Sequence, residues 1–452
     1  MDREMKAIND YLNREIDCTC GQKHSAEIKK VILESGALES IPTLVQEFGY
    51  KNIFLVYDVN TYAIAGEKLE TALRQSLISF SSYIFPDRSL VPDEYAAGRL
   101  FVHFDPTCDL LIGIGSGTIN DLCRFVSFKL GREYFIVATA PSMDGYASNV
   151  TPLIIDNMKI TCPALVPKAI IGDLDIIKNA PMSMISAGVA DILAKIVCIT
   201  DWKVAHLFFG EYACDDVIAL VDKSIQEMIS QLDNIPERSP ETIQKVMEAL
   251  ILSGIAISYI GNSRPASGSE HQMSHFWEMK FLFQGKPAIL HGTKVGVATV
   301  GVLHMYKRLL HNKPDFAAAK KAIEQHSPEQ WELEIKHVYE SAADGIFELE
   351  QEVGKNLSRN VLSRLSKMES KWPAFLKMVE KLPDENVMIS YLRDLEAPCA
   401  PAEIGVDDEM TKDAVLYAKD LRNRLGILQI LFDLGLNREY ADELIAYYHG
   451  IG

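Results

Sequence analysis

Short runs of apolar residues alternate with longer amphipathic segments in the first part of the chain. The pattern predicts strands over residues 52–57, 83–85, 109–114 and 134–138, with helices between them. Strands that are apolar throughout, without alternating polar residues, are typical of strands buried on both faces. The sequence therefore predicts an α/β domain in which helices cover both sides of a parallel sheet.

The pattern changes near Pro181. Beyond this residue it consists of long helical segments with almost no strand signal, and Pro181 itself suits the first turn of a helix. A chain of 452 residues is long enough for two domains that each bury a core. We expect a Rossmann-like α/β domain over 1–178 and an all-α helical domain over 179–452, with the active site in the cleft between them.

Composition narrows the class of protein. With 48% hydrophobic and 24% charged residues, the chain is typical of a globular protein, and its net charge of −17 disfavours nucleic acid and anionic membrane surfaces as partners. The start of the chain lacks the apolar core of a signal peptide, and no apolar run approaches the ~18 residues of a membrane-spanning helix. We therefore expect a cytoplasmic protein without membrane insertion. The eight scattered cysteines are expected to be reduced thiols.

A glycine-rich turn over residues 113–121 joins one predicted strand to a helix. Gly115 and Gly117 in this turn let the backbone approach a pyrophosphate, whose charge a helix N-terminus favours. A tight turn without a ligand is the alternative, because the spacing is not G-x-G-x-x-G. Asp58 ends an earlier strand, where it can accept hydrogen bonds from a ribose and would repel a 2′-phosphate, which favours NAD over NADP. Its alternative role is a helix N-cap.

A polar loop over residues 139–148 follows the predicted strand 134–138. Loops at the carboxyl ends of parallel strands bind ligands in sheets of this kind. The Pro, Ser, Asp and Gly residues of the loop suit an ordinary turn equally well.

Three histidines and one aspartate form a candidate metal site. His271 and His275 are four residues apart, which places them on one helix face, and His291 follows 20 residues after His271. Asp191, on an apolar helix 80 residues before His271, is the best carboxylate candidate. An Asp, His, His set with an open position suits a catalytic divalent ion. A single histidine is more often a packing residue, so the prediction rests on the whole group.

Near the start of the chain, Cys18, Cys20 and His24 also offer three metal-binding side chains. Their spacing matches no recognised structural zinc motif. Ordinary packing in a turn or strand is therefore the favoured interpretation of this segment.

The glycine turn, the polar loop, Asp191 and the three histidines together resemble sn-glycerol-1-phosphate dehydrogenases, most closely the bacterial branch. These enzymes share a fold group with iron-dependent alcohol dehydrogenases, glycerol dehydrogenase and dehydroquinate synthase. The resemblance covers roughly residues 28–310. It implies a metal-dependent reduction of dihydroxyacetone phosphate to sn-glycerol 1-phosphate by NAD(P)H, with zinc or nickel as the metal and a homodimer as the assembly.

The resemblance also implies roles for individual residues. Asp191, His271 and His291 match the metal ligands. Asp144, Asp191 and His275 match substrate contacts, and Asp191 and His275 are the expected catalytic residues. The matches to the nucleotide-binding residues are Gly117, Thr118, Ile119, Asn120, Asp121, Thr139, Ala140, Pro141, Ser142 and Ser148.

The sequence departs from the fold group at Lys195, which stands where iron-dependent alcohol dehydrogenases have a further histidine and thus argues against a four-ligand iron site. Lys195 and Lys294 are candidates for binding the substrate phosphate. Three other functions stay open: a glycerol dehydrogenase, a dehydroquinate synthase-like cyclase (a lyase), and a nucleotide-binding protein without turnover. The cyclase usually has Glu in place of Asp191. No role is assigned to the helical region after about residue 330.

Overall fold

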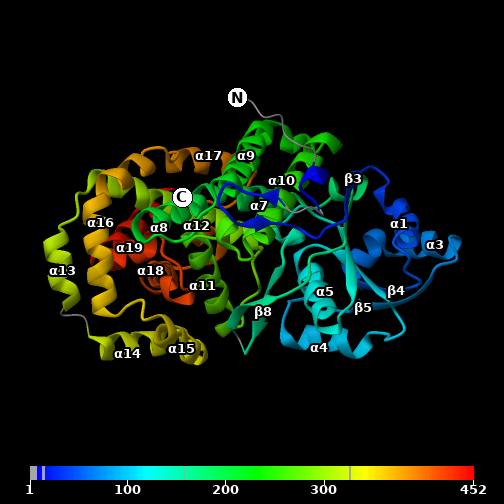
Figure 1. Cartoon of the computed structure of the whole chain (residues 1–452), viewed down its shortest axis with the longest axis horizontal. Helices are drawn as coiled ribbons and strands as arrows, with labels where there is room; N and C mark the ends of the chain where they lie inside the picture. The colour runs from blue at the N-terminus through cyan, green and yellow to red at the C-terminus, as the bar shows by residue number, and fades with distance from the viewer. Residues whose placement is uncertain (1–7, 13–15, 157, 325–326, 452) are drawn as a thin grey trace. The chain divides into compact units, whose positions relative to one another are not determined.

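The computed structural model describes residues 8–12, 16–156, 158–324 and 327–451 of the chain (Figure 1). They form two compact units. Unit 1 comprises Met1–Ile155, Lys159–Ile192 and Ala219–Ala266, and unit 2 comprises Asp156–Met158, Leu193–Ile218 and Ser267–Gly452. The chain thus passes between the units several times, whereas the sequence predicts a single change near residue 178.

Unit 1 is built around a six-stranded parallel sheet, which confirms the predicted α/β class. Its strands are β3 (Lys30–Glu34), β4 (Asn52–Asp58), β5 (Ser79–Phe85), β6 (Leu110–Gly115), β7 (Glu133–Ala138) and β10 (Ala169–Asp173). Their order across the sheet is β3-β10-β7-β6-β4-β5, and every neighbouring pair is parallel. All six carboxyl ends therefore lie along one edge.

Helices cover both faces of this sheet, which is why its central strands are apolar throughout. Leu110, Ile112 and Ile114 of β6 pack in one core with side chains of α1 (Ile41–Glu47) and α3 (Glu67–Gln75). The other face of β6 and β7 contacts α5 (Gly117–Leu130). The remaining strands and α-helices of unit 1 are β1 (Ile16–Asp17), β2 (Lys23–His24), α2 (Val59–Thr61), α4 (Glu94–His103), β8 (Val150–Ile155), β9 (Met158–Pro163), α6 (Leu174–Ile177) and α10 (Pro240–Ile260), with α7 (Met182–Leu193) and α9 (Asp215–Gln231) lying mostly in this unit.

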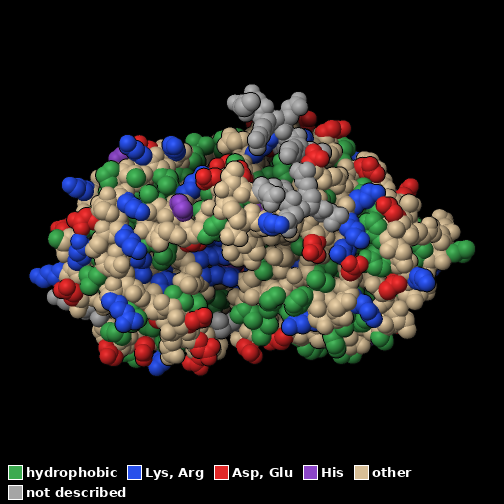
Figure 2. Space-filling view, viewed as in Figure 1, with side chains coloured by type: hydrophobic (Ala, Val, Ile, Leu, Met, Phe, Trp, Pro, Cys, Tyr) green, Lys and Arg blue, Asp and Glu red, His purple; other side chains and the backbone are tan. Residues whose placement is uncertain are grey.

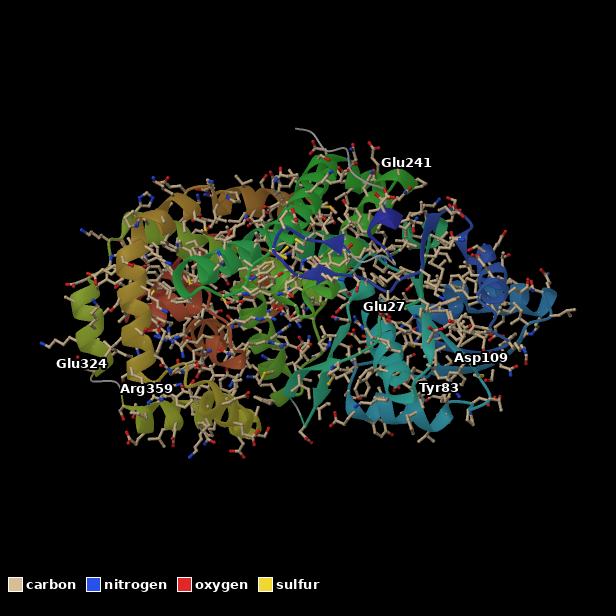
Figure 3. All side chains as sticks on the ribbon, viewed as in Figure 1. Glu27, Tyr83, Asp109, Glu241, Glu324 and Arg359 are labelled. Carbon is tan, nitrogen blue, oxygen red and sulfur yellow. The ribbon has the colours of Figure 1, made fainter. Side chains whose placement is uncertain are left out.

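Two labelled side chains in Figure 3 illustrate how side chains hold the edges of the sheet. The Asp109 carboxylate, just before β6, accepts hydrogen bonds from the backbone N–H groups of Lys51 and Asn52 at the start of β4. Tyr83 of β5 accepts a hydrogen bond of 3.1 Å from Arg99 of α4. These contacts fix neighbouring elements of unit 1 in register.

Unit 2 is helical, as predicted for the C-terminal part of the chain. Its helices are α8 (Lys195–Phe209), α11 (Ser269–Phe283), α12 (His291–His311), α13 (Phe316–Glu324), α14 (Pro328–Tyr339), α15 (Ala343–Val353), α16 (Ser358–Val379), α17 (Glu385–Asp394), α18 (Asp408–Tyr417), α19 (Ile427–Asp433) and α20 (Asn437–His449). The C-terminal helices, which had no predicted role, pack around α11 and α12. Trp277 of α11 donates its indole N–H to the Met410 carbonyl, and the Tyr448 hydroxyl donates to the Val297 carbonyl of α12.

Two helical stretches, Met182–Phe209 and Pro240–Ile260, have the length and apolar composition of membrane-spanning segments. The expectation that no apolar run approaches that length is therefore wrong. In the apolar 18-residue window of each stretch, 78% and 72% respectively is buried inside the protein, as in the core helices of a globular fold. Figure 2 shows acidic and basic side chains interspersed over the visible surface.

Candidate active site

The glycine turn lies at a topological switch point of the unit 1 sheet. The chain leaves β4 towards β5 on one side and leaves β6 towards β7 on the other, so the connections diverge between the carboxyl ends of β4 and β6. Ligands of doubly wound sheets bind in the crevice that such a divergence opens. The turn after β6 is a single residue, Ser116, before α5 begins at Gly117.

The first turn of α5 has the features of a phosphate-binding turn. The side chain of its N-cap residue, Ser116, makes no capping hydrogen bond, so the first N–H groups of α5 are not satisfied by it. Close packing explains why residue 115 is glycine, because a Cβ there would lie 2.6 Å from Cβ of Ile119. Gly117 faces more room, since its nearest neighbour would be Cγ of Met143 at 3.3 Å. The predicted pyrophosphate role thus depends on Gly117 and Thr118, which are partly exposed.

Asp58 lies at the carboxyl end of β4, on the other side of the switch point. Its Oδ1 accepts hydrogen bonds of 2.8 Å from the N–H groups of Asn60 and Thr61, so that it caps α2. This is the N-cap role that the sequence left open beside ribose binding.

The polar loop after β7 is held by a buried ion pair at the start of α5. The Arg124 guanidinium pairs with the Asp121 carboxylate and donates to the carbonyls of Gly145 and Ser148, at 2.7 and 3.2 Å. Burial raises the pKa of Asp121, and the neighbouring guanidinium opposes that shift. Asn120 also donates to the Gly145 carbonyl. Asp121 and Asn120, predicted as nucleotide contacts, therefore position the loop, and Arg124 is a residue that sequence reasoning missed.

The rest of the loop is packed against two helices of unit 1. A Cβ at Gly188 of α7 would lie 1.8 Å from the carbonyl oxygen of Pro141, and one at Gly254 of α10 would lie 2.8 Å from that of Asp144. Tyr146 is fully buried and donates to the Ala140 carbonyl, so it is a core residue. The predicted nucleotide contacts Thr139, Ala140, Pro141, Ser142 and Ser148 are all buried in this arrangement.

Asp144 and Asp191, both predicted substrate contacts, come together in unit 1. The backbone N–H of Asp144 donates to Oδ2 of Asp191 over 3.1 Å, and the Ser253 hydroxyl donates to the Asp144 carboxylate over 2.8 Å. Both aspartates are buried, at 8% and 0% exposure. Asp191 is held at the end of α7, one turn after the close contact of Gly188 with the loop.

The three histidines come together in unit 2. The ring centroids of His271 and His291 lie 5.1 Å apart, and His275 lies 6.0 and 5.7 Å from them. Ring nitrogens of His271 and His291 approach within 4.8 Å of each other, a separation that one ion can bridge. The predicted grouping of these side chains is therefore present on α11 and α12, which pack side by side.

Glu270 orients His271. Its Oε1 lies 2.6 Å from Nδ1 of His271 and accepts a hydrogen bond from the Gly268 N–H. Since a carboxylate accepts, it favours the proton on Nδ1 and leaves Nε2 with a lone pair for a metal. Burial raises the pKa of Glu270 to about 7, while the positive charges of Lys195 and Arg424 oppose that shift. Sequence reasoning assigned Glu270 no role, although its position next to His271 is the available signal.

Asp201 of α8 fixes the start of α11. Its carboxylate accepts hydrogen bonds from the N–H and the hydroxyl of Ser269, at 2.7 and 2.6 Å, and from the Ile427 N–H at the start of α19. A carboxylate is stabilising at a helix N-terminus, and the Asp201 carboxylate lies at the N-termini of both α11 and α19. Asp201 is therefore a structural support for the histidine-bearing helix.

The two lysines predicted as phosphate contacts have different surroundings. Lys294 is buried and pairs with Glu278 at 3.1 Å. Lys195 is fully buried and acts electrostatically on Glu270, together with Arg424. Arg424 was not predicted, because it follows the predicted metal ligands by more than a hundred residues and only the fold brings it near Glu270.

Known protein families and sequences are similar to this chain. A family profile described as iron-containing alcohol dehydrogenase matches residues 32–181. The glycerol-1-phosphate dehydrogenase (NAD(P)+) of Halalkalibacterium halodurans is 30% identical over 419 residues, which cover 92% of this chain and 95% of that protein. That of Bacillus subtilis is 30% identical and covers 90% of this chain and 91% of its own. At nine-tenths of the chain, these alignments extend beyond residues 28–310.

The fold comparison gives a broader group. The crystal structure of a probable glycerol dehydrogenase from Sinorhizobium meliloti has a TM-score of 0.63, with 13% identity over 94% of this chain and 98% of that one. The butanol dehydrogenase A of Thermotoga maritima, described as NADH-dependent, has a TM-score of 0.57 and 13% identity over 91% and 96% of the two chains. At such identity these structures support the fold alone.

Proposed function

Because the chain belongs to the glycerol-1-phosphate dehydrogenase family, we propose that it is a metal-dependent oxidoreductase that reduces dihydroxyacetone phosphate to sn-glycerol 1-phosphate with NAD(P)H. The observation that carries the proposal is the histidine pair His271 and His291 with Glu270 behind it. It occurs in a chain that aligns with its relatives over nine-tenths of its length.

We assign Asp191, His271 and His291 as the ligands of one divalent ion, zinc or nickel. Two imidazole nitrogens and a carboxylate oxygen suit ions of this borderline class. The Glu270 carboxylate, which sets the tautomer of His271, supports that fit. When bound, the ion supplies Lewis-acid polarisation of the substrate oxygen.

Two further residues act on the substrate in this proposal. His275 lies one helical turn from His271 and is half-buried, which suits a group that holds a substrate hydroxyl or transfers its proton. Asp144 is held by two hydrogen bonds, one from the Ser253 hydroxyl to its carboxylate and one from its own N–H to Asp191. In this proposal its carboxylate accepts a hydrogen bond from a second substrate hydroxyl. Asp191 and His275 are the proposed catalytic residues.

The nucleotide is proposed to bind at the switch point of unit 1. The uncapped first turn of α5 supports a pyrophosphate beside Gly117 and Thr118. The nicotinamide supplies the hydride, and the protein sets its distance and angle. Asp58 accepts two backbone hydrogen bonds, and its carboxylate would repel a 2′-phosphate, so NADH is the proposed reductant.

The substrate phosphate is proposed to contact Lys195 and Arg424. Both are cations that act on buried Glu270, which places positive charge beside the histidine pair. Lys294 is the weaker candidate because Glu278 pairs with it. A homodimer in the cytoplasm is the proposed setting, and light scattering of the purified protein tests the assembly.

The test is oxidation of NADH and NADPH by protein that has been stripped with a chelator and resupplied with Zn²⁺, Ni²⁺ or Fe²⁺. Dihydroxyacetone phosphate and unphosphorylated dihydroxyacetone are compared as substrates. We expect activity with the phosphate, restored by metal and abolished in His271→Ala. The control is His311→Ala, because His311 is an exposed histidine at the far end of the helix that carries His291.

Each other outcome selects a different function. Preference for unphosphorylated dihydroxyacetone selects a glycerol dehydrogenase. No oxidation of either nucleotide, although metal and nucleotide bind, selects the cyclase or the protein without turnover. Chiral analysis of the product separates sn-glycerol 1-phosphate from its enantiomer.

A further inference from the structure

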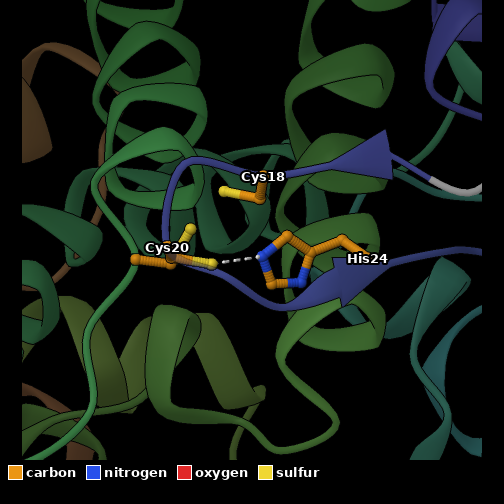
Figure 4. Close-up of side chains that lie close together, drawn as sticks. Cys18, Cys20 and His24 are labelled. Atoms are coloured by element: carbon orange, nitrogen blue, oxygen red, sulfur yellow. Dashed lines mark hydrogen bonds between the residues drawn. The ribbon is translucent and has the colours of Figure 1, made fainter.

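A second group of metal-binding side chains lies near the start of the chain, in unit 1. The strands β1 and β2 form a hairpin, and Cys18, Cys20 and His24 project from its turn and second strand towards one another (Figure 4). Their Sγ and ring nitrogen atoms lie within 4.8 Å of one another. The proposed reaction uses none of these residues.

The hydrogen bonds of His24 prepare it to be a metal ligand. Its Nδ1 lies 2.8 Å from the backbone carbonyl of Tyr259 in α10. A carbonyl only accepts, so Nδ1 carries the proton and Nε2 of the neutral ring carries a lone pair. Nε2 faces Sγ of Cys20 at 3.4 Å. His24 is 3% exposed, and its ring stacks on that of Tyr259, so its orientation is fixed by packing.

The turn also prepares the sulfur atoms. Gly21 has φ +82°, which lets the chain reverse directly after Cys20. As a result the backbone N–H of Gln22 donates to Sγ of Cys20 over 3.4 Å. A hydrogen bond from a backbone N–H stabilises the thiolate form, and the thiolate is the form that binds metals.

The distances suit zinc. With Zn–S of about 2.3 Å and Zn–N of about 2.0–2.1 Å, a tetrahedral ion separates its sulfur and nitrogen ligands by about 3.5 Å. The observed separation of Sγ of Cys20 from Nε2 of His24 is 3.4 Å. Two thiolates and one imidazole are ligands that favour zinc over magnesium, calcium or manganese.

The hairpin also needs a support of this kind. Within the residues that the structure describes, it pairs two residues on each strand, Ile16 with His24 and Asp17 with Lys23. A two-stranded hairpin is marginally stable by itself, and one of this length has little apolar surface to bury. An ion held by three of its side chains would fix both the turn and its attachment to α10.

We propose that Cys18, Cys20 and His24 bind a structural Zn²⁺ ion that fastens the β1–β2 hairpin to α10. A donor from outside the hairpin completes the tetrahedral coordination. The competing explanation is a thiol of Cys20 that donates a hydrogen bond to His24 without any metal, and it predicts that no metal binds here.

The test uses the full chain, loaded with Zn²⁺ or with Co²⁺. Thiolate ligands give Co²⁺ a sulfur-to-metal charge-transfer absorption, which the oxygen and nitrogen ligands of the proposed catalytic ion do not give. We expect this absorption in the parent protein and in His271→Ala/His291→Ala. We expect it to be lost in Cys18→Ser/Cys20→Ser, together with one zinc ion per chain. Cys162→Ser is the control, because Cys162 is another partly exposed cysteine of unit 1 outside the hairpin.

Parent protein that shows no charge-transfer absorption overturns the proposal, and so does absorption that survives in Cys18→Ser/Cys20→Ser. The parent spectrum decides the matter even where the double variant does not fold. None of these measurements depends on turnover, so the zinc proposal and the proposed reaction fail or succeed separately.

Discussion

Gly188→Ala tests how the candidate site is assembled in unit 1. Gly188 lies in α7, one turn before Asp191, where the helix touches the loop after β7. An added Cβ would lie 1.8 Å from the Pro141 carbonyl oxygen, 2.8 Å from its carbon and 3.3 Å from Cδ1 of Leu250. Two of these three atoms belong to backbone, so rotating a side chain does not relieve the clash.

The size of the effect follows from these distances. Ordinary van der Waals contact begins at 3.4 Å, whereas the added Cβ would lie 1.8 Å from the Pro141 oxygen. The helix and the loop must therefore move apart by about 1.6 Å. Overpacking of this kind costs about 3 kcal/mol or more, and alanine in place of glycine returns about 1 kcal/mol of helix propensity. We expect the free energy of unfolding to fall by about 2 kcal/mol. Metal binding should weaken as well, since a shift of this size exceeds the ~0.5 Å tolerance of a preorganised site.

Gly98→Ala is the matched control. Gly98 also lies inside a helix of unit 1, α4, and a Cβ there meets nothing within 4 Å. Its substitution should therefore raise stability by about 1 kcal/mol. Urea unfolding followed by circular dichroism measures both variants, and hydrogen exchange of the peptide over residues 139–148 reports on the loop. Equal stability of the two variants, with unchanged exchange in the loop, would refute the reasoning.

Three further predictions test individual groups. Arg124→Met should destabilise the protein by about 3–5 kcal/mol because it leaves the buried Asp121 carboxylate without its ion-pair partner. Adding Asp121→Asn should restore part of the free energy of unfolding measured in urea. No recovery in the double variant contradicts the pairing. Glu270→Gln should weaken zinc binding about 10- to 100-fold in a chelator competition, with the fold retained; unchanged affinity would show that Glu270 does not orient His271. Burial lowers the pKa of Lys355 from 10.5 to about 8, so between these values the unfolded chain binds more protons. The stability of the parent relative to Lys355→Met should therefore rise with pH above about 8, by at most ~1.4 kcal/mol per pH unit, and a flat difference over pH 7–9.5 counts against the shift.

The sequence by itself determined the class of fold and the family. Strands such as β6 are apolar throughout because both faces are covered, and that pattern can be read without coordinates. His271 and His275 share a helix face because the helical repeat places residues four apart on one side. Both features depend on neighbours along the chain, and local geometry suffices to predict them.

The tertiary structure decided what distant residues do to one another. Arg124 has no motif, and only the fold brings its guanidinium to the carbonyls of the loop after β7. The sequence assigns no role to the C-terminal helices, whereas in the structure they pack around α11 and α12. The segment from Cys18 to His24 matches no spacing rule for a metal site. The hydrogen bond of His24 to the Tyr259 carbonyl, 235 residues later, exists only in the folded chain. Such contacts depend on how elements pack, and the periodicity of one segment does not record which surface it will meet.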